Sequence, residues 1–301
     1  MTFAQKLNQA ADATQNRLQS LLDDLVEPTA TSPRLAAAMR HALLGGGKRF
    51  RPFLLLESAA LFGVAERTAI DTACALECVH CYSLTHDDLP AMDNDMMRRG
   101  QPTVWNAYDE WTAILAGDAL LTLAFEILTR DETLADPNIR AQLVLELAKA
   151  SGAMGMVGGQ ALDLEAEKAN TTAPHTRDSI RRMQSMKTGA LIRFACTAGA
   201  TLAAAPADDR QRLTRYGDTL GFAFQIADDL LDVEGTAEET GKAVAKDAGA
   251  GKATLVSLLG LEPARRKLSE LEHEAIGLMT HYGERGTTLS QAASFVVNRR
   301  S

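Results

Sequence analysis

Apolar residues recur every three or four positions along most of the chain, which is the period of a helix with one buried face. Leu18, Leu21, Leu22 and Leu25 show this spacing in the first helix, and the breaker-rich stretch 28–33 ends it. No stretch alternates apolar and polar residues convincingly enough for a strand. The pattern therefore predicts an all-α protein.

Glycine, proline and polar stretches divide the rest of the chain into helices and connections. The second helix is expected to stop at Gly45-Gly46-Gly47, and Pro52 lies where the next one begins. Five more apolar-rich segments have helical length: 70–86, 111–129, 139–151, 154–167 and 188–204. Three polar stretches are expected to be surface connections, the last of them a mobile flap: 170–175, 208–209 and 235–252.

The composition is that of a globular chain. The 301 residues are 46% hydrophobic, which is ample for a core, and no linker divides them. We expect a single domain, residues 1–301, in which roughly ten or more helices surround a central cavity. The net charge of -8 argues against nucleic-acid binding and favours small-molecule partners.

Neither the N-terminus nor the interior carries a clear membrane or export signal. The first residues lack the charged start and continuous apolar core of a signal peptide. No run of about 18 apolar residues occurs. These features predict a cytoplasmic protein without a stable membrane anchor.

The four cysteines lie within apolar helical segments: Cys74, Cys78, Cys81 and Cys196. The first three share one helical stripe. A zinc site completed by His80 or His86 is the alternative, but zinc-binding pairs usually sit on turns. The pattern favours reduced, buried thiols.

Four aspartates lie within nine residues after the apolar segment 70–86: Asp87, Asp88, Asp93 and Asp95. Such carboxylates repel one another unless water or a hard cation such as Mg²⁺ neutralises them. A solvated turn is the simplest interpretation, but the apolar helix before them and Arg98-Arg99 after them favour a metal and diphosphate site. Pro90 is expected to end the helix, so a loop must return Asp93 toward Asp87.

A second acidic cluster interrupts an apolar stretch far downstream, at Asp228, Asp229 and Asp232. On a helix, Asp228 and Asp232 are one turn apart and share a face. Like charges at this spacing are destabilising, so a bound cation is again the natural compensation.

Basic and polar residues supply candidate anion ligands. Lys48, Arg49 and Arg51 lie at a glycine-rich turn beside a helix start, where backbone N–H groups also favour anions. His80 precedes Asp87 by seven residues and lies nearly on the same helical face. Further candidates are ordinary surface residues when taken singly: Lys187, Thr188, Gln225, Lys242 and Lys252.

Together these motifs resemble the trans-isoprenyl diphosphate synthases, and most closely the bacterial farnesyl diphosphate synthases. The motifs run in order over nearly the whole chain: G-G-K-R-F-R-P (46–52), H-x6-D-D-x4-D-x4-R-R-G (80–100), G-G-Q-A-L-D-L (158–164), K-T-G (187–189), F-Q-I-A-D-D-L-L-D (224–232) and G-K before a D-x4-K loop (241–252). Ala227 and Met97 depart from the family pattern, but neither is expected to contact a ligand.

The resemblance implies the isoprenoid synthase fold, a homodimer and about three Mg²⁺ ions per active site. It implies Asp87, Asp93 and Asp228 as metal ligands. The catalytic residues it implies are these three together with Asp88, Arg98, Lys187, Asp229 and Lys242. The allylic diphosphate, dimethylallyl or geranyl, is assigned to Arg98, Lys187, Thr188, Gln225, Lys242 and Lys252. Isopentenyl diphosphate is assigned to Gly47, Lys48, Arg51, His80 and Arg99. The implied reaction is ionisation of the allylic diphosphate followed by attack of the isopentenyl double bond.

Product length is expected to depend on the helix before Asp87. Ser83 and Tyr82 lie four and five residues earlier, roughly 6 to 7.5 Å deeper along the axis. Tyr82 carries the larger side chain and is the expected floor of the prenyl pocket, although ordinary core packing is the alternative. In the resembling family a bulky residue here accompanies short products, so farnesyl diphosphate is expected and geranylgeranyl diphosphate is the alternative.

Three other functions fit parts of the pattern. A class I terpene cyclase also uses an aspartate-rich helix and Mg²⁺, but it would not need the basic turn or a second acidic motif. A metal phosphohydrolase of the His-Asp type would use His86-Asp87, yet the six histidines supply no convincing further ligand pair. A non-catalytic, protein-binding relative would not need both acidic motifs intact.

Overall fold

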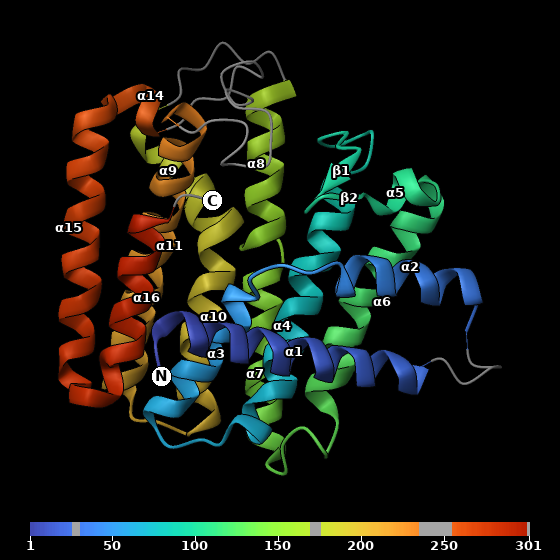
Figure 1. The fold of residues 1–301 in the computed structure, drawn as a ribbon, viewed down its shortest axis with the longest axis horizontal. Coiled ribbons are helices and arrows are strands. Elements are labelled where there is room, and N and C mark those ends of the chain that lie inside the picture. Colours follow the sequence, from blue (N-terminus) through green and yellow to red (C-terminus); the bar gives the residue numbers. More distant parts are fainter. Residues whose placement is uncertain (26–30, 169–175, 235–254, 300–301) are drawn as a thin grey trace. The chain divides into compact units, whose positions relative to one another are not determined.

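The computed structural model describes residues 1–25, 31–168, 176–234 and 255–299, and helices dominate these residues (Figure 1). The all-α prediction is confirmed. Contacts divide the chain into two compact units, Met1–Leu145 with Thr201–Ala203 and Glu146–Ala200 with Ala204–Ser301. The expectation of one domain around a central cavity stays a prediction.

The first unit is organised around α4, which packs against four other helices. Its helices are α1 (Phe3–Leu25), α2 (Pro33–Leu44), α3 (Phe50–Leu61), α4 (Glu66–Asp87), α5 (Val104–Ala107) and α6 (Glu110–Thr129). Buried positions such as Ala73, Cys74, Ala75 and Leu76 follow one another without a break along α4. A helix buried around its circumference belongs to the centre of a core, and this one carries the first acidic motif at its end.

A short hairpin follows the first acidic motif and was not expected from the sequence. Strands β1 (Met97–Arg98) and β2 (Gln101–Pro102) pair antiparallel with Arg98 opposite Gln101. The two turn residues, Arg99 and Gly100, have φ values of 53° and 76°. Positive φ at both positions is the requirement of a type I′ hairpin turn, whereas two-residue strands are too short for an alternating pattern.

The second unit contains α11 at its centre, with α15 and α16 packed against it (Figure 1). Its elements are α8 (Met156–Lys168), α9 (Arg177–Gln184), a π-helical turn (Ser185–Gly189), α10 (Ala190–Leu202), α11 (Ala207–Glu234), α14 (Leu255–Leu259), α15 (Leu261–Met279), a 3-10 segment (Thr280–Gly286) and α16 (Thr287–Asn298). Helix α7 (Pro137–Ser151) crosses the boundary between the units.

One expected connection is wrong. Asp208 and Asp209 lie in the first turn of α11 rather than in a surface loop. Acidic side chains are stabilised at this end of a helix, and Pro206 directly before Ala207 favours a helix start at this point. The other two expected connections, 170–175 and 235–252, lie outside the described residues.

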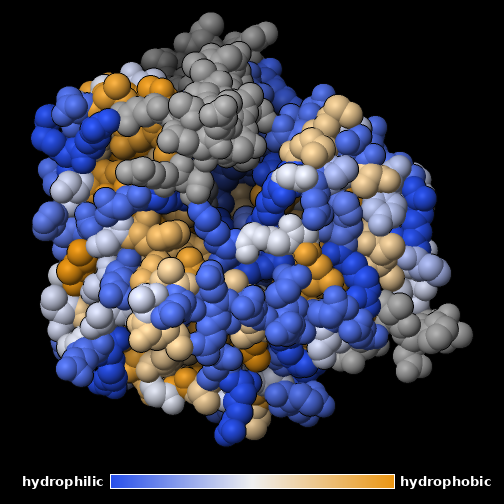
Figure 2. Space-filling view, viewed as in Figure 1, coloured by the Kyte–Doolittle hydropathy of each residue, from blue (hydrophilic) through white to orange (hydrophobic). Residues whose placement is uncertain are grey.

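Among the described residues, α6 alone is long and apolar enough to cross a membrane. The expected absence of a continuous run of about 18 apolar residues is not contradicted by this helix, because Asp118 and Glu126 interrupt it. Half of the apolar window is buried, and α6 packs on α4, so a core position also explains its composition. Figure 2 shows a largely hydrophilic surface, with apolar side chains gathered over α14 and the start of α15, where Leu258 and Leu261 are exposed.

Candidate functional site

The first acidic motif is a compact loop at the end of α4. Helix α4 ends at Asp87, three residues before Pro90. The backbone N–H of Asp93 donates to the carbonyl oxygen of Asp87 at 2.8 Å, and that of Asp95 donates to Asp88 at 3.1 Å. The predicted helix end and the return of Asp93 toward Asp87 are confirmed.

Arg98 stabilises this loop by donating hydrogen bonds to two of its aspartates. Its Nε donates to Oδ1 of Asp88 at 2.6 Å, and its Nη2 donates to Oδ2 of Asp95 at 3.3 Å. Asp88 is buried, and burial raises its pKa to about 6 although Arg98 opposes the shift. A guanidinium has five N–H donors, so these two contacts leave Arg98 with further donors, and its predicted role in binding a diphosphate stays a prediction.

Arg99, the next residue, turns to a different partner. Its Nη1 donates to the carbonyl oxygen of Gly46 at 2.5 Å. A Cβ on Gly47, whose φ is 118°, would lie 2.7 Å from Cζ of Arg99. Glycine at position 47 therefore serves both the backbone conformation and the close approach of this guanidinium.

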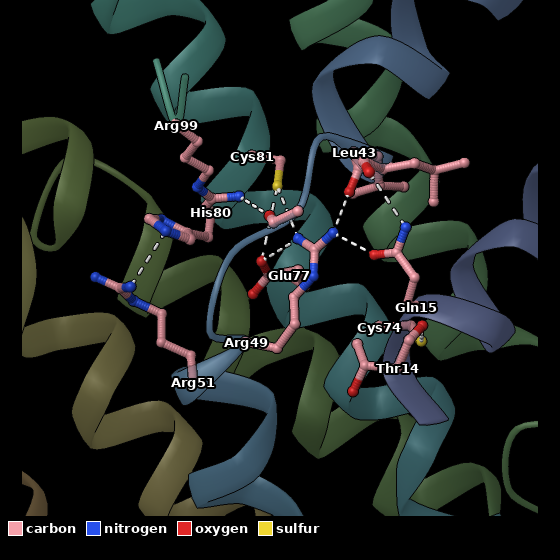
Figure 3. A network of polar contacts seen from close by, with 12 residues as sticks. Thr14, Gln15, Leu43, Arg49, Arg51, Cys74, Glu77, His80, Cys81 and Arg99 are labelled. Carbon is pink, nitrogen blue, oxygen red and sulfur yellow. Dashed lines mark hydrogen bonds and ion pairs between the residues drawn. The ribbon is translucent and has the colours of Figure 1, made fainter. Parts of the chain in front are cut away.

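Arg51 and His80 meet beside the same turn, as Figure 3 shows. Nη1 of Arg51 lies 3.2 Å from Nε2 of His80. Burial and then the charges of Arg51 and Arg99 lower the pKa of His80 well below its ordinary value. The imidazole is therefore neutral at pH 7, and its Nε2 accepts the hydrogen bond because a guanidinium can only donate.

The residues predicted for isopentenyl diphosphate are thus assembled within the first unit. Arg51 meets His80, Arg99 lies on the glycine turn, and Lys48 belongs to that turn. Arg49, grouped with Lys48 and Arg51 in the sequence, instead points inward and is buried. Sequence alone gave no signal that separated these three cations.

The second acidic motif lies on the continuous helix α11, which confirms that Asp228 and Asp232 share a face. Asp228 is exposed, and Arg299 forms an ion pair with it. The same guanidinium lies 3.7 Å from the centroid of the Phe224 ring. Arg299 lies near the end of the chain, and the sequence analysis missed it.

Asp229 is buried and holds the structure around it. Its Oδ2 accepts hydrogen bonds from the backbone N–H of Leu255 at 3.2 Å and from Nε2 of Gln184 at 3.3 Å. The second motif is therefore tied to α14 and α9 through this one carboxylate.

Lys187 lies in the π-helical turn, where its Nζ contacts Oδ2 of Asp163 at 2.6 Å. A Cβ on Gly159 would lie 2.1 Å from the backbone nitrogen of Lys187, so α8 packs directly against this turn. This gives the Gly158–Leu164 motif a structural role. Thr188 and Gln225 are partly buried in the same unit, and Lys242 and Lys252 lie outside the described residues.

Tyr82 is buried one and a half turns before Asp87, with its ring edge-on to His86 at a centroid distance of 5.7 Å. Burial, and then the charge of Asp87, raise the pKa of Tyr82 to about 12. The Ser83 hydroxyl is directed to its own helix and donates to the carbonyl oxygen of His80 at 2.8 Å. The roles of Tyr82 and Ser83 in product length stay predictions.

All four cysteines are free and buried, which confirms that prediction. Burial raises the pKa of Cys81 to about 11 and those of Cys74 and Cys78 well above the ordinary thiol value. No three His, Cys, Asp or Glu side chains of the described residues form a metal-holding group. The oxygen donors of the acidic motifs suit a hard ion such as Mg²⁺, and which of them bind it stays a prediction.

The fold and the two motifs have counterparts in known proteins. Residues 32–282 match the polyprenyl synthetase family, and the chain belongs to this family. It is 41% identical over 308 aligned positions to farnesyl diphosphate synthase of Escherichia coli (strain K12), covering 99% of each chain. It is also 41% identical to geranylgeranyl diphosphate synthase of Cyanophora paradoxa, over 88% of this chain and 87% of the relative.

Among solved structures, the chain is similar to an apo FPP/GFPP synthase from Zymomonas mobilis, with a TM-score of 0.87, 42% identity and 98% of both chains covered. The protein is therefore a short-chain trans-prenyl diphosphate synthase, a prenyltransferase of isoprenoid biosynthesis. Its family generally uses Mg²⁺ and acts on prenyl diphosphates.

Proposed function

We propose that the protein condenses isopentenyl diphosphate with dimethylallyl and then geranyl diphosphate to give farnesyl diphosphate. The observation that carries this proposal is the bulk of Tyr82, buried roughly 7.5 Å along α4 from Asp87. Its ring occupies the depth at which a growing tail would extend. Sequence identity cannot decide the product, because relatives named for farnesyl and geranylgeranyl diphosphate are equally similar.

The catalytic groups follow from the motifs as assigned above. Asp87, Asp93 and Asp228 would hold about three Mg²⁺ ions, which stabilise the charge on departing diphosphate. Arg98, Lys187, Thr188 and Gln225, with Lys242 and Lys252, bind the allylic phosphates. Asp88 and Asp229 keep the two acidic segments in place.

The second substrate binds at Gly47, Lys48, Arg51, His80 and Arg99. When the allylic C1–O bond breaks, its electron pair leaves with diphosphate. The double bond of isopentenyl diphosphate then attacks C1, and the released diphosphate takes the proton that is lost. The side chains bind, orient and exclude water, so no nucleophilic residue is required.

The direct test is product analysis with labelled isopentenyl diphosphate, each allylic diphosphate and Mg²⁺, with EDTA as the metal-free control. We expect C15 product and no turnover after chelation. A C20 main product would favour the geranylgeranyl alternative. Diphosphate release without isopentenyl diphosphate would favour a cyclase, and no turnover at all would favour a non-catalytic relative.

Tyr82→Ala tests the pocket floor. We expect the main product to shift to C20 or longer, with a loss of about 3 kcal/mol in unfolding free energy from the void. Tyr82→Phe keeps the ring and should retain C15, which makes it the matched control. An Ala variant that folds, turns over and still stops at C15 would place the length determinant elsewhere.

Self-association is the last part of the proposal. Trp111, Ile114 and Leu115 are exposed at helical spacing on α6 and form an apolar face for a second copy. Sedimentation velocity should show a dimer that Ile114→Glu disrupts. The cytoplasmic location stays a prediction.

A further inference from the structure

Arg49 is the middle cation of the basic turn, and its side chain leaves the turn for the interior of the first unit (Figure 3). It precedes α3 as the N-cap residue and has a φ of 46°. The left-handed region is disfavoured for a residue with a Cβ, so this backbone needs support from other contacts.

That support comes from three helices at once. Nη1 of Arg49 donates to Oε1 of Glu77 on α4 at 2.6 Å. Nη2 donates to Oε1 of Gln15 on α1 at 2.7 Å and to the carbonyl oxygen of Leu43 on α2 at 2.5 Å. The Leu43 carbonyl belongs to the last turn of α2, where backbone acceptors lack a partner within the helix. One guanidinium therefore joins α1, α2 and α4 to the start of α3.

The ion pair between Arg49 and Glu77 is expected to add little to the free energy of unfolding. The Arg49 and Glu77 side chains are only 1% and 2% exposed. Removing two charges from water offsets most of their attraction, so a buried pair usually stabilises a fold no better than apolar residues of the same size. What the ion pair does provide is a defined geometry, because the planar guanidinium fixes the angle and distance of each partner.

The position of the pair connects it to the predicted isopentenyl diphosphate site. Glu77 lies one helical turn before His80 on α4, and Arg49 lies two residues before Arg51. Fixing Arg49 on Glu77 sets the register in which Nη1 of Arg51 reaches Nε2 of His80 at 3.2 Å. Gly46, which accepts from Arg99, precedes Arg49 by three residues on the same turn.

We propose that the buried Arg49–Glu77 pair, with Gln15, is the positioning device of the isopentenyl diphosphate site. It holds Lys48, Arg51 and the glycine turn against His80 and Arg99 without contacting the substrate. This inference rests on the proposed function, since it assigns a purpose to the geometry of that substrate's site.

Glu77→Gln is the first test, since the amide keeps a hydrogen-bond acceptor and loses the charge. We expect KM for isopentenyl diphosphate to rise about tenfold to hundredfold, because small displacements of binding groups are costly. The allylic KM and kcat should stay within about threefold of wild type. Gln15→Ala removes a weaker contact, leaves the ion pair in place and should raise the same KM less.

The matched control is a second buried carboxylate between α1 and α4. Asp71 accepts from Nε of Arg17 at 2.6 Å and is 8% exposed, but it lies six residues before Glu77. Asp71→Asn should lower the melting temperature without changing KM for isopentenyl diphosphate. An equal rise in that KM for Asp71→Asn and Glu77→Gln would show a general effect of destabilising the unit.

The double variant Arg49→Met/Glu77→Leu separates positioning from folding. Replacing both charges leaves neither one buried alone, so the melting temperature should recover relative to Arg49→Met. KM should remain high because the turn has lost its tie to α4. Recovery of both stability and KM would overturn the proposal. Failure of the proposed function would look different, since the wild-type protein itself would then show no dependence on isopentenyl diphosphate.

Discussion

Asp87 lies at the end of a helix and Asp228 lies within one, so the two acidic motifs hold their carboxylates by different means. Backbone hydrogen bonds and Arg98 shape the first motif as a loop. Helical periodicity shapes the second, and Arg299 contacts it from the end of the chain.

In both motifs the second acid is buried: Asp88 is 3% exposed and Asp229 is 7% exposed. Asp88 binds Arg98, and Asp229 accepts from Leu255 and Gln184. The acid before each of them is more exposed. The comparison shows that in each motif the buried carboxylate is the one that holds neighbouring structure. That the more exposed acid before it binds a ligand stays a prediction.

The largest expected effect tests this division. Asp228→Ala should lower kcat by about hundredfold or more and change unfolding free energy by less than about 1 kcal/mol, since this carboxylate is half exposed. Asp229→Ala should lower the free energy of unfolding by about 1–3 kcal/mol, because the buried backbone N–H of Leu255 would lose its hydrogen-bond acceptor. Thermal unfolding and steady-state kinetics measure both. Equal loss of stability in the two variants would break the comparison.

The paired arginines give the next largest effect. Arg99→Ala should raise KM for isopentenyl diphosphate about tenfold, because Arg99 lies on the glycine turn. Arg98→Ala should act mainly on the allylic substrate, because Arg98 lies in the acidic loop. KM measured for each substrate at saturating co-substrate decides the point, and identical profiles would contradict separate sites.

Arg299 gives a smaller effect that belongs to the second motif alone. It competes with any cation for Asp228, so Arg299→Ala should lower the Mg²⁺ concentration for half-maximal activity by about two- to fivefold. Calorimetry of Mg²⁺ with inorganic diphosphate gives a reading independent of turnover. Arg193→Ala, which breaks the 2.9 Å ion pair with Asp218, is the control and should leave the Mg²⁺ dependence unchanged.

The smallest expected effect is on the pH dependence of stability, through His80 in the first unit. The pKa of His80 is lowered in the folded state, so below about pH 6.5 the unfolded chain binds more protons than the folded one. Stability should therefore fall as pH decreases from 6.5, by at most about 1.4 kcal/mol per pH unit. His80→Asn should be less sensitive over this window in denaturant titrations. Equal slopes for the variant and wild type would show that His80 titrates normally.

Much of this architecture could be predicted because it depends on local signals. Helical period marked the main segments, and Pro90 together with the acid spacing predicted the loop that returns to Asp87. The hairpin turn at Arg99-Gly100 has positive φ at both residues, but arginine at the first turn position is not one of the residues that mark such a turn in a sequence.

Other features depend on partners far away in the sequence. Lys48, Arg49 and Arg51 are chemically alike, and the distant acceptors Glu77 and Gln15, with the Leu43 carbonyl, hold Arg49 inward. Arg299 contacts Asp228 across about seventy residues, which no local pattern encodes. The π-helical turn at Lys187 similarly depends on close packing against Gly159.

The reactivity of the buried cysteines can be used to measure when each unit of the protein opens. Cys74, Cys78 and Cys81 lie on α4 in the first unit, and Cys196 lies on α10 in the second. A thiol-modifying reagent reacts with the thiolate, so burial and raised pKa values protect each site until its helix separates from its neighbours. Mass increments collected over time, assigned by peptide mapping, would reveal whether the two units open together or one before the other.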